Sequence, residues 1–208
     1  MYETRTGQQS EDFSLDALRA GDRAEFARLV ETYSGAIYRL AVKMLGNPQD
    51  AEDILQETFI KAFRHLADFD GRSKVSTWLY RIATTEALMF LRRQKIYPLS
   101  IDQPFDQAET EEQEPLQIVD WCCLPEDELM SDEARSYLDQ AIEELTPALK
   151  IVFLLRDIEG LSTRETGQVL EISEAAVKTR LSRARLQLRE LLTAYYGEKL
   201  LEGDGKGG

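Results

Sequence analysis

The side chains best suited to chemistry lie between Leu161 and Leu192, where hydroxyl, ammonium and guanidinium groups recur along one expected helix. One side of that helix is apolar, because four residues recur at spacings of four, three and four: Val177, Leu181, Ala184 and Leu188. The other side carries small and basic residues: Ala175, Ala176, Lys178, Thr179, Ser182, Arg183 and Arg185. Such a surface suits a helix that enters a major groove and contacts bases and phosphates. An ordinary amphipathic hairpin with a solvated basic face is the alternative.

A shorter helix precedes this one, and the two together have the pattern of a helix-turn-helix. Ser162 and Glu165 have the spacing of a capping box, in which each side chain bonds the other residue's backbone N–H. The short helix runs to Leu170. After a tight turn, Ser173 is expected to cap the second helix, with Glu174 in its first turn.

No arrangement of residues predicts catalysis. The single histidine, His65, falls on the polar side of a helix, and no glycine-rich phosphate loop, nucleophile elbow or metal-ligand spacing occurs. The acids around Asp53 and Glu57 have no histidine partners and lie beside an expected helix N-terminus, so the helix dipole and a partner surface explain them better than a metal. We expect no catalytic residue, no metal site, no cofactor and no enzyme activity.

A second nucleic-acid signal lies between Phe69 and Arg93, where aromatic and basic residues alternate. The aromatic residues are Phe69, Trp78, Tyr80 and Phe90, and the basic ones are Arg72, Lys74, Arg81, Arg92 and Arg93. Aromatic faces can stack on unpaired bases while cations follow the backbone, as in proteins that bind single strands. Alternatively, Trp78, Leu79 and Ile82 belong to a hydrophobic core.

The net charge of −13 at pH 7 is concentrated in one segment. Between Lys95 and Arg135 there is no lysine or arginine, and twelve acidic residues fall there: Asp102, Asp106, Glu109, Glu111, Glu112, Glu114, Asp120, Glu126, Asp127, Glu128, Asp132 and Glu133. Without them, the 26 remaining acids nearly balance the 25 basic residues. The pattern predicts an acidic linker between two nearly neutral bodies.

The periodicity predicts an all-α fold of two small helical bodies, without strands or internal repeats. Helices are expected over residues 14–20, 22–44, 48–66, 75–94, 132–145 and 147–160, followed by the helix-turn-helix; residues 197–208 are expected to form a frayed tail. The helix from 48 is expected to bury Phe63. No apolar run approaches the roughly 18 residues of a membrane span, and the polar N-terminus does not resemble a signal peptide.

The adjacent Cys122 and Cys123 are the only cysteines, which excludes a disulfide framework or a cysteine-rich zinc site. We interpret them as reduced thiols, and a vicinal redox sensor is the weaker alternative. These features together predict a soluble cytoplasmic protein with no membrane span.

Three motifs, in order, resemble those of bacterial RNA polymerase sigma factors of the extracytoplasmic-function (ECF) group of the sigma-70 family. They are DAEDILQETFIKAF, FDGRSKVSTWLYRIA and LSTRETGQVLEISEAAVKTRLSRARLQLREL, which are similar to the family's polymerase-binding helix, promoter-melting segment and −35-reading helix-turn-helix. With their flanking helices, they cover most of residues 10–95 and 132–193.

The resemblance implies a sigma factor that binds core RNA polymerase and directs promoter-specific initiation. Residues 10–95 would form region 2, which binds polymerase and recognises and melts the −10 element. Residues 96–131 would form the acidic linker, and residues 132–196 would form region 4, whose helix-turn-helix reads the −35 element. Residues 197–208 would form the flexible tail. The implied partners are the beta-prime clamp helices and the beta flap of core polymerase, promoter DNA and an anti-sigma factor. The alternative is a helix-turn-helix transcriptional regulator that is not a polymerase subunit.

Carried over by position, the resemblance also implies residue roles. Asp53, Gln56 and Glu57 would bind the clamp helices. Gly71, Arg72, Ser73, Lys74, Trp78 and Arg81 would face the −10 element. Ala175, Lys178, Thr179, Ser182 and Arg183 would face the −35 duplex, with Arg180 and Arg185 on phosphates.

Three positions depart from the family pattern. The family's melting helix usually carries Asn and Asp where this chain has Thr85 and Met89, so a different −10 preference is expected. The turn between the DNA-reading helices usually carries Gly where Glu171 stands, which predicts a left-handed backbone at a cost of about 1 kcal/mol or a slightly different turn.

The charge distribution predicts that the free protein binds promoters weakly. Each nearly neutral body should gain little from counterion release, and the acidic linker should repel the duplex. A flexible linker of about 35 residues spans roughly 30–35 Å, so it must be held extended on a scaffold to reach two promoter elements. The resemblance implies that this scaffold is the polymerase cleft, on the path of nascent RNA.

Overall fold

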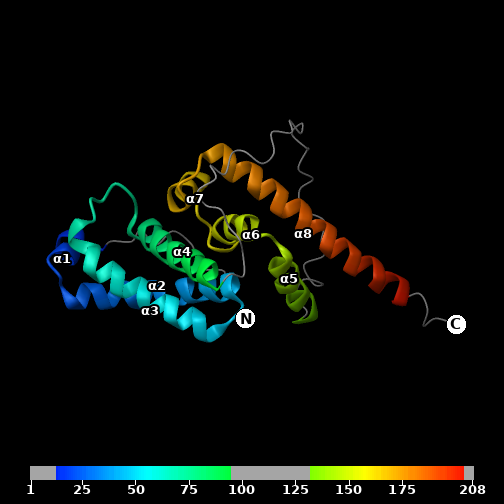
Figure 1. Cartoon of the computed structure of the whole chain (residues 1–208), viewed down its shortest axis with the longest axis horizontal. Coiled ribbons are helices and arrows are strands. Elements are labelled where there is room, and N and C mark those ends of the chain that lie inside the picture. The colour runs from blue at the N-terminus through cyan, green and yellow to red at the C-terminus, as the bar shows by residue number, and fades with distance from the viewer. Residues whose placement is uncertain (1–12, 95–131, 204–208) are drawn as a thin grey trace.

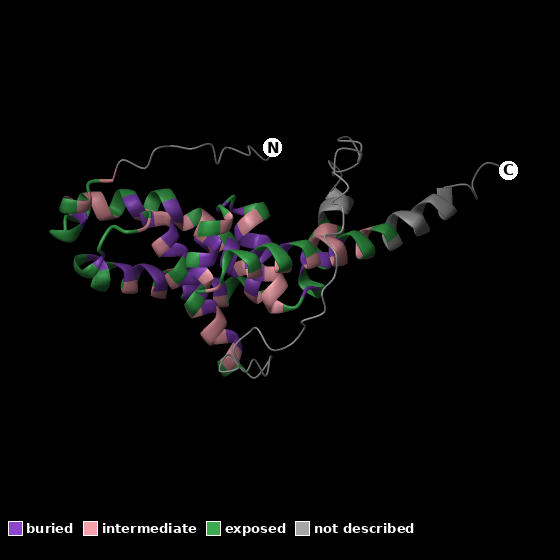
Figure 2. Cartoon of the chain, turned by 90° about the horizontal axis from the view of Figure 1, so that it is seen from above, coloured by how far each residue is buried: buried purple, intermediate pink, exposed green. Residues whose placement is uncertain are grey.

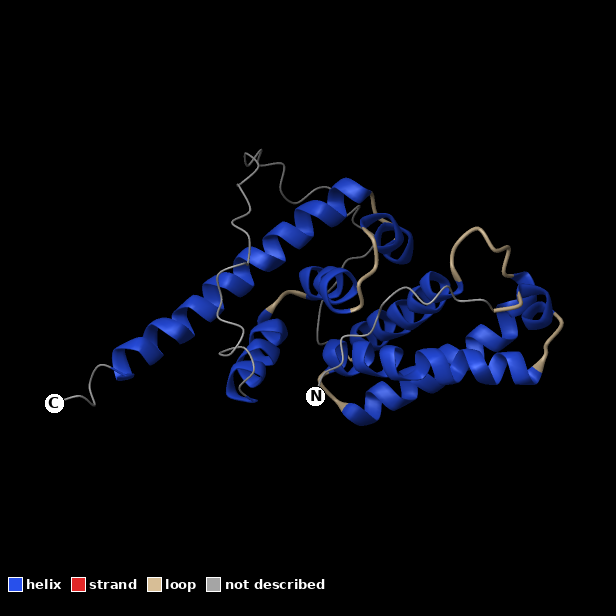
Figure 3. Ribbon diagram, turned by 180° about the vertical axis from the view of Figure 1, so that it is seen from behind, coloured by secondary structure: helices blue, strands red, loops and turns tan. Residues whose placement is uncertain are grey.

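The structure is a computed structural model that describes residues 13–94 and 132–203. Both ranges are helical, and no strand occurs within them (Figures 1 and 3). The first range contains α1 (Leu15–Arg19), α2 (Arg23–Leu45), α3 (Pro48–His65), the 3-10 turn η1 (Leu66–Asp68) and α4 (Val75–Arg93). The second contains α5 (Asp132–Glu144), α6 (Pro147–Phe153), the π-helical η2 (Leu154–Ile158), α7 (Thr163–Leu170) and α8 (Glu174–Gly203). The predicted all-α fold is confirmed.

Helices α2 and α3 begin and end at local signals in the sequence. Asp22 caps α2 by accepting hydrogen bonds from two backbone N–H groups of its first turn, at 2.8 and 3.0 Å. Gly46 ends α2 with a φ of 70°, Asn47 caps α3, and Pro48 opens it. The apolar faces of α2, α3 and α4 then meet in a core that includes Leu29, Ile37, Phe59, Leu66 and Leu79.

The helix-turn-helix forms as the sequence predicts. The hydroxyl of Ser162 accepts from the backbone N–H of Glu165 at 3.2 Å, and the carboxylate of Glu165 accepts from the N–H of Ser162 at 2.8 Å. Ser173 caps α8 at 3.1 Å. Glu171, in the turn, has a φ of 56°, so the expected left-handed backbone is present. The predicted apolar face is buried along its whole length: Val177, Leu181, Ala184 and Leu188.

The two halves of the chain pack against each other. Helix α7 lies against α4, and α6 lies near α2 (Figure 1). Buried apolar residues of both halves form one continuous cluster, which includes Leu40 and Ala87 from the first half and Leu155 and Val177 from the second. Figure 2 shows buried residues continuing through the middle of the molecule. The sequence predicts two bodies but not this contact between them.

Two expectations need correction. Phe63 is not part of the core: its side chain is 48% exposed, and its ring lies edge-on to Phe26 with centroids 5.0 Å apart. Helix α8 continues to Gly203, so the boundary expected before residue 197 falls within a helix. The acidic segment 96–131 and the cysteine pair at 122 and 123 lie outside the described residues.

Candidate nucleic-acid interface

The polar face of α8 is open to solvent where the sequence predicts a duplex. Among the residues predicted for the −35 element, four are exposed: Ala175, Lys178, Thr179 and Ser182. Three are half-buried: Arg180, Arg183 and Arg185. The caps at Ser162 and Ser173 and the buried apolar face of α8 fix both helices. They therefore hold the polar face of α8 in one orientation. Hydroxyl and cationic groups on it can bond base edges and phosphates.

Arg185 has a structural partner that sequence reasoning missed. Its Nε and Nη2 atoms each donate to a carboxylate oxygen of Asp157, both at 2.8 Å. The hydrogen bond to Asp157 raises the pKa of Arg185; burial opposes this shift, and the carboxylate's charge adds to it. The pair ties α8 to η2, and Asp157 competes with the phosphate expected there. No local pattern links these two residues, which are 28 positions apart.

The loop between η1 and α4 is held by a second residue that the sequence did not single out. Arg19, at the end of α1, donates from Nε and Nη2 to the carbonyl oxygen of Phe69, at 2.9 and 2.7 Å. Gly71 adopts a φ of 77°. The carboxylate of Asp70 then accepts from the backbone N–H of Arg72 and pairs with its Nε, both at 3.0 Å. Arg72 is highly exposed, so its cation is displayed on a fixed loop.

Of the aromatic residues expected to stack on bases near the N-terminus of α4, only one keeps an accessible ring. Phe69 and Tyr80 are buried, each 5% exposed, so neither can stack on a base. Trp78 is half-buried and packs on Phe69, with ring centroids 5.0 Å apart. Leu79 is fully buried, and Ile82 packs against the same core. The core alternative therefore holds for most of these residues, and Trp78 keeps one partly accessible side.

Two basic side chains of the −10 surface, those of Lys74 and Arg81, face the other half of the chain. The ammonium group of Lys74 lies 2.8 Å from a carboxylate oxygen of Glu165. Arg81 forms an ion pair with Glu171. Burial alone would raise the pKa of Glu165, but hydrogen bonds from Lys74 and Ser162 and the charge of Lys74 lower it to about 2. Both cations are thus neutralised by acids of the helix-turn-helix.

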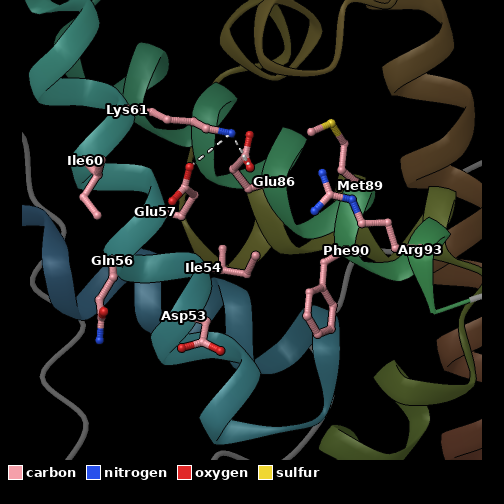
Figure 4. Close-up of a pocket in the computed structure, with 10 residues that line it drawn as sticks. All are labelled: Asp53, Ile54, Gln56, Glu57, Ile60, Lys61, Glu86, Met89, Phe90 and Arg93. Carbon is pink, nitrogen blue, oxygen red and sulfur yellow. Dashed lines mark ion pairs between the residues drawn. The ribbon is translucent and has the colours of Figure 1, made fainter.

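The polymerase-binding residues predicted on α3 border a groove of about 490 Å³ between α3 and α4 (Figure 4). Asp53 and Gln56 are exposed on its α3 side, whereas Glu57 is half-buried. Lys61 reaches between Glu57 and Glu86, at 3.4 and 2.6 Å. The hydrogen bond with Glu86 raises the pKa of Lys61; burial opposes it, and the two carboxylate charges add to it.

The α4 side of the groove is more apolar. It is formed by Glu86, Met89, Phe90 and Arg93. Met89 and Phe90 therefore offer apolar surface beside the carboxylates of α3. A groove of this kind suits a partner helix that carries both basic and apolar side chains.

The described residues contain no cluster of three or more acids, histidines or cysteines that could hold a metal ion. None of their helices is long and apolar enough to cross a bilayer.

Two parts of the chain match known family sequences. Residues 29–96 match Sigma-70 region 2, and residues 135–188 match Sigma-70, region 4. Over 182 residues, the chain is 39% identical to the "ECF RNA polymerase sigma factor SigW" of Bacillus subtilis (strain 168), covering 86% of this chain and 94% of that protein. Over 178 residues, it is 33% identical to the "ECF RNA polymerase sigma-E factor" of Escherichia coli (strain K12), covering 86% and 92%.

Solved structures share the fold. CnrH, solved in complex with the cytosolic domain of CnrY, aligns with a TM-score of 0.61 at 24% identity and covers 86% of this chain and 95% of that one. The sigma factor RpoE of Bartonella quintana, crystallised with the anti-sigma factor NepR, aligns with a TM-score of 0.59 at 22% identity and covers 81% and 97%.

Proposed function

The chain belongs to the ECF group of RNA polymerase sigma factors, and from this premise we propose how its two halves divide the work. It binds core RNA polymerase and directs promoter-specific transcription initiation. The presence of both family regions in one chain favours this function over a helix-turn-helix regulator that acts apart from polymerase. In our proposal, residues 10–95 act as region 2 and residues 132–196 as region 4, with 96–131 as the linker. The protein acts in the cytoplasm and performs no catalytic step itself.

Region 4 reads the −35 element with the exposed face of α8. This proposal rests mainly on one observation: the capped helix-turn-helix exposes Lys178, Thr179 and Ser182 while it buries the opposite face. Arg183, half-buried beside them, contributes a guanidinium group that can bond a guanine edge in two places. Arg180 contacts phosphate. Arg185 can contact phosphate only when its hydrogen bonds to Asp157 are broken.

Region 2 captures the −10 element with the loop that contains Arg72 and with the start of α4. Arg72 is displayed by a loop that Arg19 holds in place. Lys74 and Arg81 add cations along α4, and Trp78 offers an aromatic edge next to them. Gly71 and Ser73 allow the backbone to approach the strand. One accessible aromatic ring supports capture of a single base rather than a run of stacked bases.

The groove between α3 and α4 binds the beta-prime clamp helices. Asp53 and Gln56 lie exposed at its edge, so they can pair with a basic partner helix. Glu57 already pairs with Lys61, so it holds the Lys61 side chain in place and also faces the clamp helices. Region 4 contacts the beta flap. An anti-sigma factor is the expected inhibitor, since the two structural relatives named above were solved with protein partners.

Reconstitution with core polymerase tests these assignments. Asp53→Lys should weaken binding to core polymerase about tenfold or more, because a like charge at an interface costs several kcal/mol. Glu31→Lys makes an equal charge change at an exposed position of α2. It is the control and should bind core polymerase normally. Binding is measured by fluorescence anisotropy of labelled protein. Normal binding by the Asp53 variant would exclude this face as the polymerase contact.

Initiation on a library of promoters tests the DNA surfaces. Arg183→Ala should leave polymerase binding intact and reduce discrimination at one or two −35 positions by about 1–3 kcal/mol. If the chain binds core polymerase but Arg183→Ala selects the same −35 sequences with equal efficiency, the role given to α8 is wrong.

A further inference from the structure

The first helix of the chain lies beside the loop proposed to capture the −10 element. We name residues 70–74, between Phe69 and α4, the −10 loop. Helix α1 (Leu15–Arg19) packs against η1, at the point where this loop leaves the helical bundle (Figures 1 and 3). The match to Sigma-70 region 2 begins at residue 29, so it assigns no role to α1. The contacts of α1 with the loop therefore have to be interpreted from this chain alone.

Arg19 holds the backbone immediately before the −10 loop begins. Its Nε and Nη2 atoms both donate to the carbonyl oxygen of Phe69, at 2.9 and 2.7 Å. The backbone N–H of Phe69 donates to the carbonyl oxygen of Leu66 at 3.2 Å. The ring of Phe69 packs on Trp78, with centroids 5.0 Å apart. The N–H, the carbonyl group and the ring of Phe69 are thus all held, so the loop starts from a fixed point.

The other end of the loop has no comparable polar anchor to the bundle. Lys74 stands at the N-cap position of α4. An ammonium group only donates hydrogen bonds, so Lys74 cannot cap the N–H groups of the first turn as Asp22 and Asn47 do in α2 and α3. Its side chain is 71% exposed and pairs with Glu165 in the other half of the chain. The conformation of the loop therefore depends strongly on the bond that Arg19 makes.

Helix α1 is itself fixed well enough to act as an anchor. A helix of five residues is not stable alone, so tertiary contacts must hold it. The hydroxyl of Ser14 caps its first turn at 3.2 Å, and the N–H of Ser14 donates to a carboxylate oxygen of Glu25 in α2 at 2.8 Å. Leu18 is 1% exposed and lies in the core of the first half. The position of Arg19 is thus set by α2 and by the core.

We propose that Arg19 is a positioning residue for capture of the −10 element. Through the carbonyl group of Phe69, it keeps the −10 loop in the conformation that receives the strand, and it does so without contacting DNA. Helix α1 also borders the loop directly, because a β-carbon at Gly71 would lie 3.5 Å from Nη2 of Arg19 and from a methyl group of Leu15. This inference rests on the proposed role of the loop in the capture of the −10 element.

The strength of the Arg19 bond sets the size of the expected effect. A partly exposed hydrogen bond of this kind changes the population of the conformation it favours by a factor of about 2–15. Only that conformation captures the strand, so loss of the bond lowers the apparent affinity for the −10 strand by up to the same factor. Affinity for core polymerase and for the −35 duplex should not change, because those surfaces lie on α3 and α8.

The first test follows the loop in the free, full-length protein. Trp78 and Trp121 are the only tryptophans, so Trp121→Phe leaves Trp78 as the single reporter next to Phe69. In this background, Arg19→Ala should increase the quenching of Trp78 fluorescence by acrylamide. Arg23→Ala removes the same charge at an exposed position of α2 and should leave the quenching unchanged. Equal quenching in the Arg19 and Arg23 variants would overturn the proposal.

Arg19→Ala should fold, because alanine favours a helix and the buried Leu18 remains in place. Urea unfolding followed by circular dichroism checks this point. Arg19→Lys is the milder second variant, since it keeps the charge but replaces the planar fork by one ammonium group. Its quenching should lie between those of the wild type and Arg19→Ala. Quenching equal to that of the wild type in both variants would exclude Arg19 as the anchor of the loop.

The second test uses the complex with core polymerase on a promoter selected from the library. A forked version of this promoter, with the non-template −10 strand unpaired, should bind about 2- to 15-fold more weakly with Arg19→Ala than with Arg23→Ala. Affinity for a duplex that carries only the −35 element should be equal in the two complexes. The salt dependence of binding to the fork should also be equal. A slope smaller by about 0.7 for Arg19→Ala would mean a lost phosphate contact and would overturn the positioning role.

The outcome for the wild-type protein separates this inference from the proposed function. If the wild-type complex with core polymerase does not bind the forked promoter, the proposed function is wrong, whatever the fluorescence of Trp78 shows. If it binds the fork and Arg19→Ala binds equally well, the function stands and the role given to Arg19 is wrong.

Discussion

Tyr80→Phe is expected to lower the free energy of unfolding by about 1.5–3 kcal/mol at pH 7. The change removes one hydroxyl and leaves the ring, so no cavity accompanies it. That hydroxyl donates to the buried carboxylate of Glu159 at 2.7 Å. A hydrogen bond to a charged group contributes about 1.5–3 kcal/mol, and the carboxylate that remains has lost its donor. Urea unfolding followed by circular dichroism measures the change.

The pH dependence provides a sharper test. Burial raises the pKa of Glu159 above its ordinary value of 4.5, and the bond from Tyr80 and the charges of Arg39 and Lys43 lower it in part. The folded state then holds the proton more tightly than the unfolded state, so this group's contribution to stability falls as the pH rises through the raised value. Removing the Tyr80 hydroxyl raises that pKa further. The cost of Tyr80→Phe should therefore be small below pH 4.5 and grow toward pH 7.

A double-mutant cycle isolates the pair. Glu159→Gln keeps an acceptor and removes the charge, so Tyr80→Phe should cost only about 0.5–1.5 kcal/mol in that background. Tyr38→Phe, at a half-buried tyrosine of α2, is the control and should change stability by less than about 0.5 kcal/mol. If Tyr80→Phe lowers the free energy of unfolding by less than about 0.5 kcal/mol, or by an amount that does not vary with pH, the hydroxyl of Tyr80 does not stabilise a charged Glu159.

Three further changes test two positions of region 4 and, as a comparison for Gly167, one glycine of α2. A β-carbon at Gly167 would lie 2.9 Å from the carbonyl oxygen of Ile172, so Gly167→Ala should cost about 1–3 kcal/mol and impair −35-dependent initiation; thermal unfolding and transcription measure the two effects. Gly35→Ala, in mid-helix with only a flexible side chain nearby, should instead stabilise the protein by about 0.5–1 kcal/mol. Arg185→Ala should lower stability by about 0.2–1 kcal/mol through loss of the Asp157 pair, and an unchanged melting temperature would show that this pair does not stabilise region 4.

The helices were predictable because the signals that set them are local. Asp22, Asn47 and Ser162 cap helices by bonding N–H groups two or three residues ahead, and these spacings can be read directly from the sequence. The buried face of α8 follows likewise from the four-three-four spacing that begins at Val177. The order of the three family motifs then predicted the family. None of these inferences requires knowledge of which helices touch.

The contacts between distant elements were not predictable. Phe69 and Trp78 are both aromatic residues among basic ones, yet Phe69 is buried and Trp78 only partly so, because Arg19 and α1 fix the loop from 50 residues away. Phe63 lies on a helix face with an apolar pattern, but the packing of Phe26 against its ring leaves it 48% exposed. Its burial depended on the length and direction of neighbouring helices, which a single-helix pattern does not contain.

Glu171 shows how magnitudes decide whether an ion pair stabilises the turn that carries it. A non-glycine residue in the left-handed region costs about 1–2 kcal/mol, and Glu171 has a φ of 56°. Its pair with Arg81, at side-chain exposures of 67% and 52%, contributes only about 0.2–1 kcal/mol. The ion pair therefore does not offset the backbone strain, and glycine at 171 should leave region 4 as stable or more stable. What glycine cannot supply is a carboxylate opposite Arg81. The buried apolar cluster that both halves share therefore contributes more to the contact between them than this exposed ion pair does.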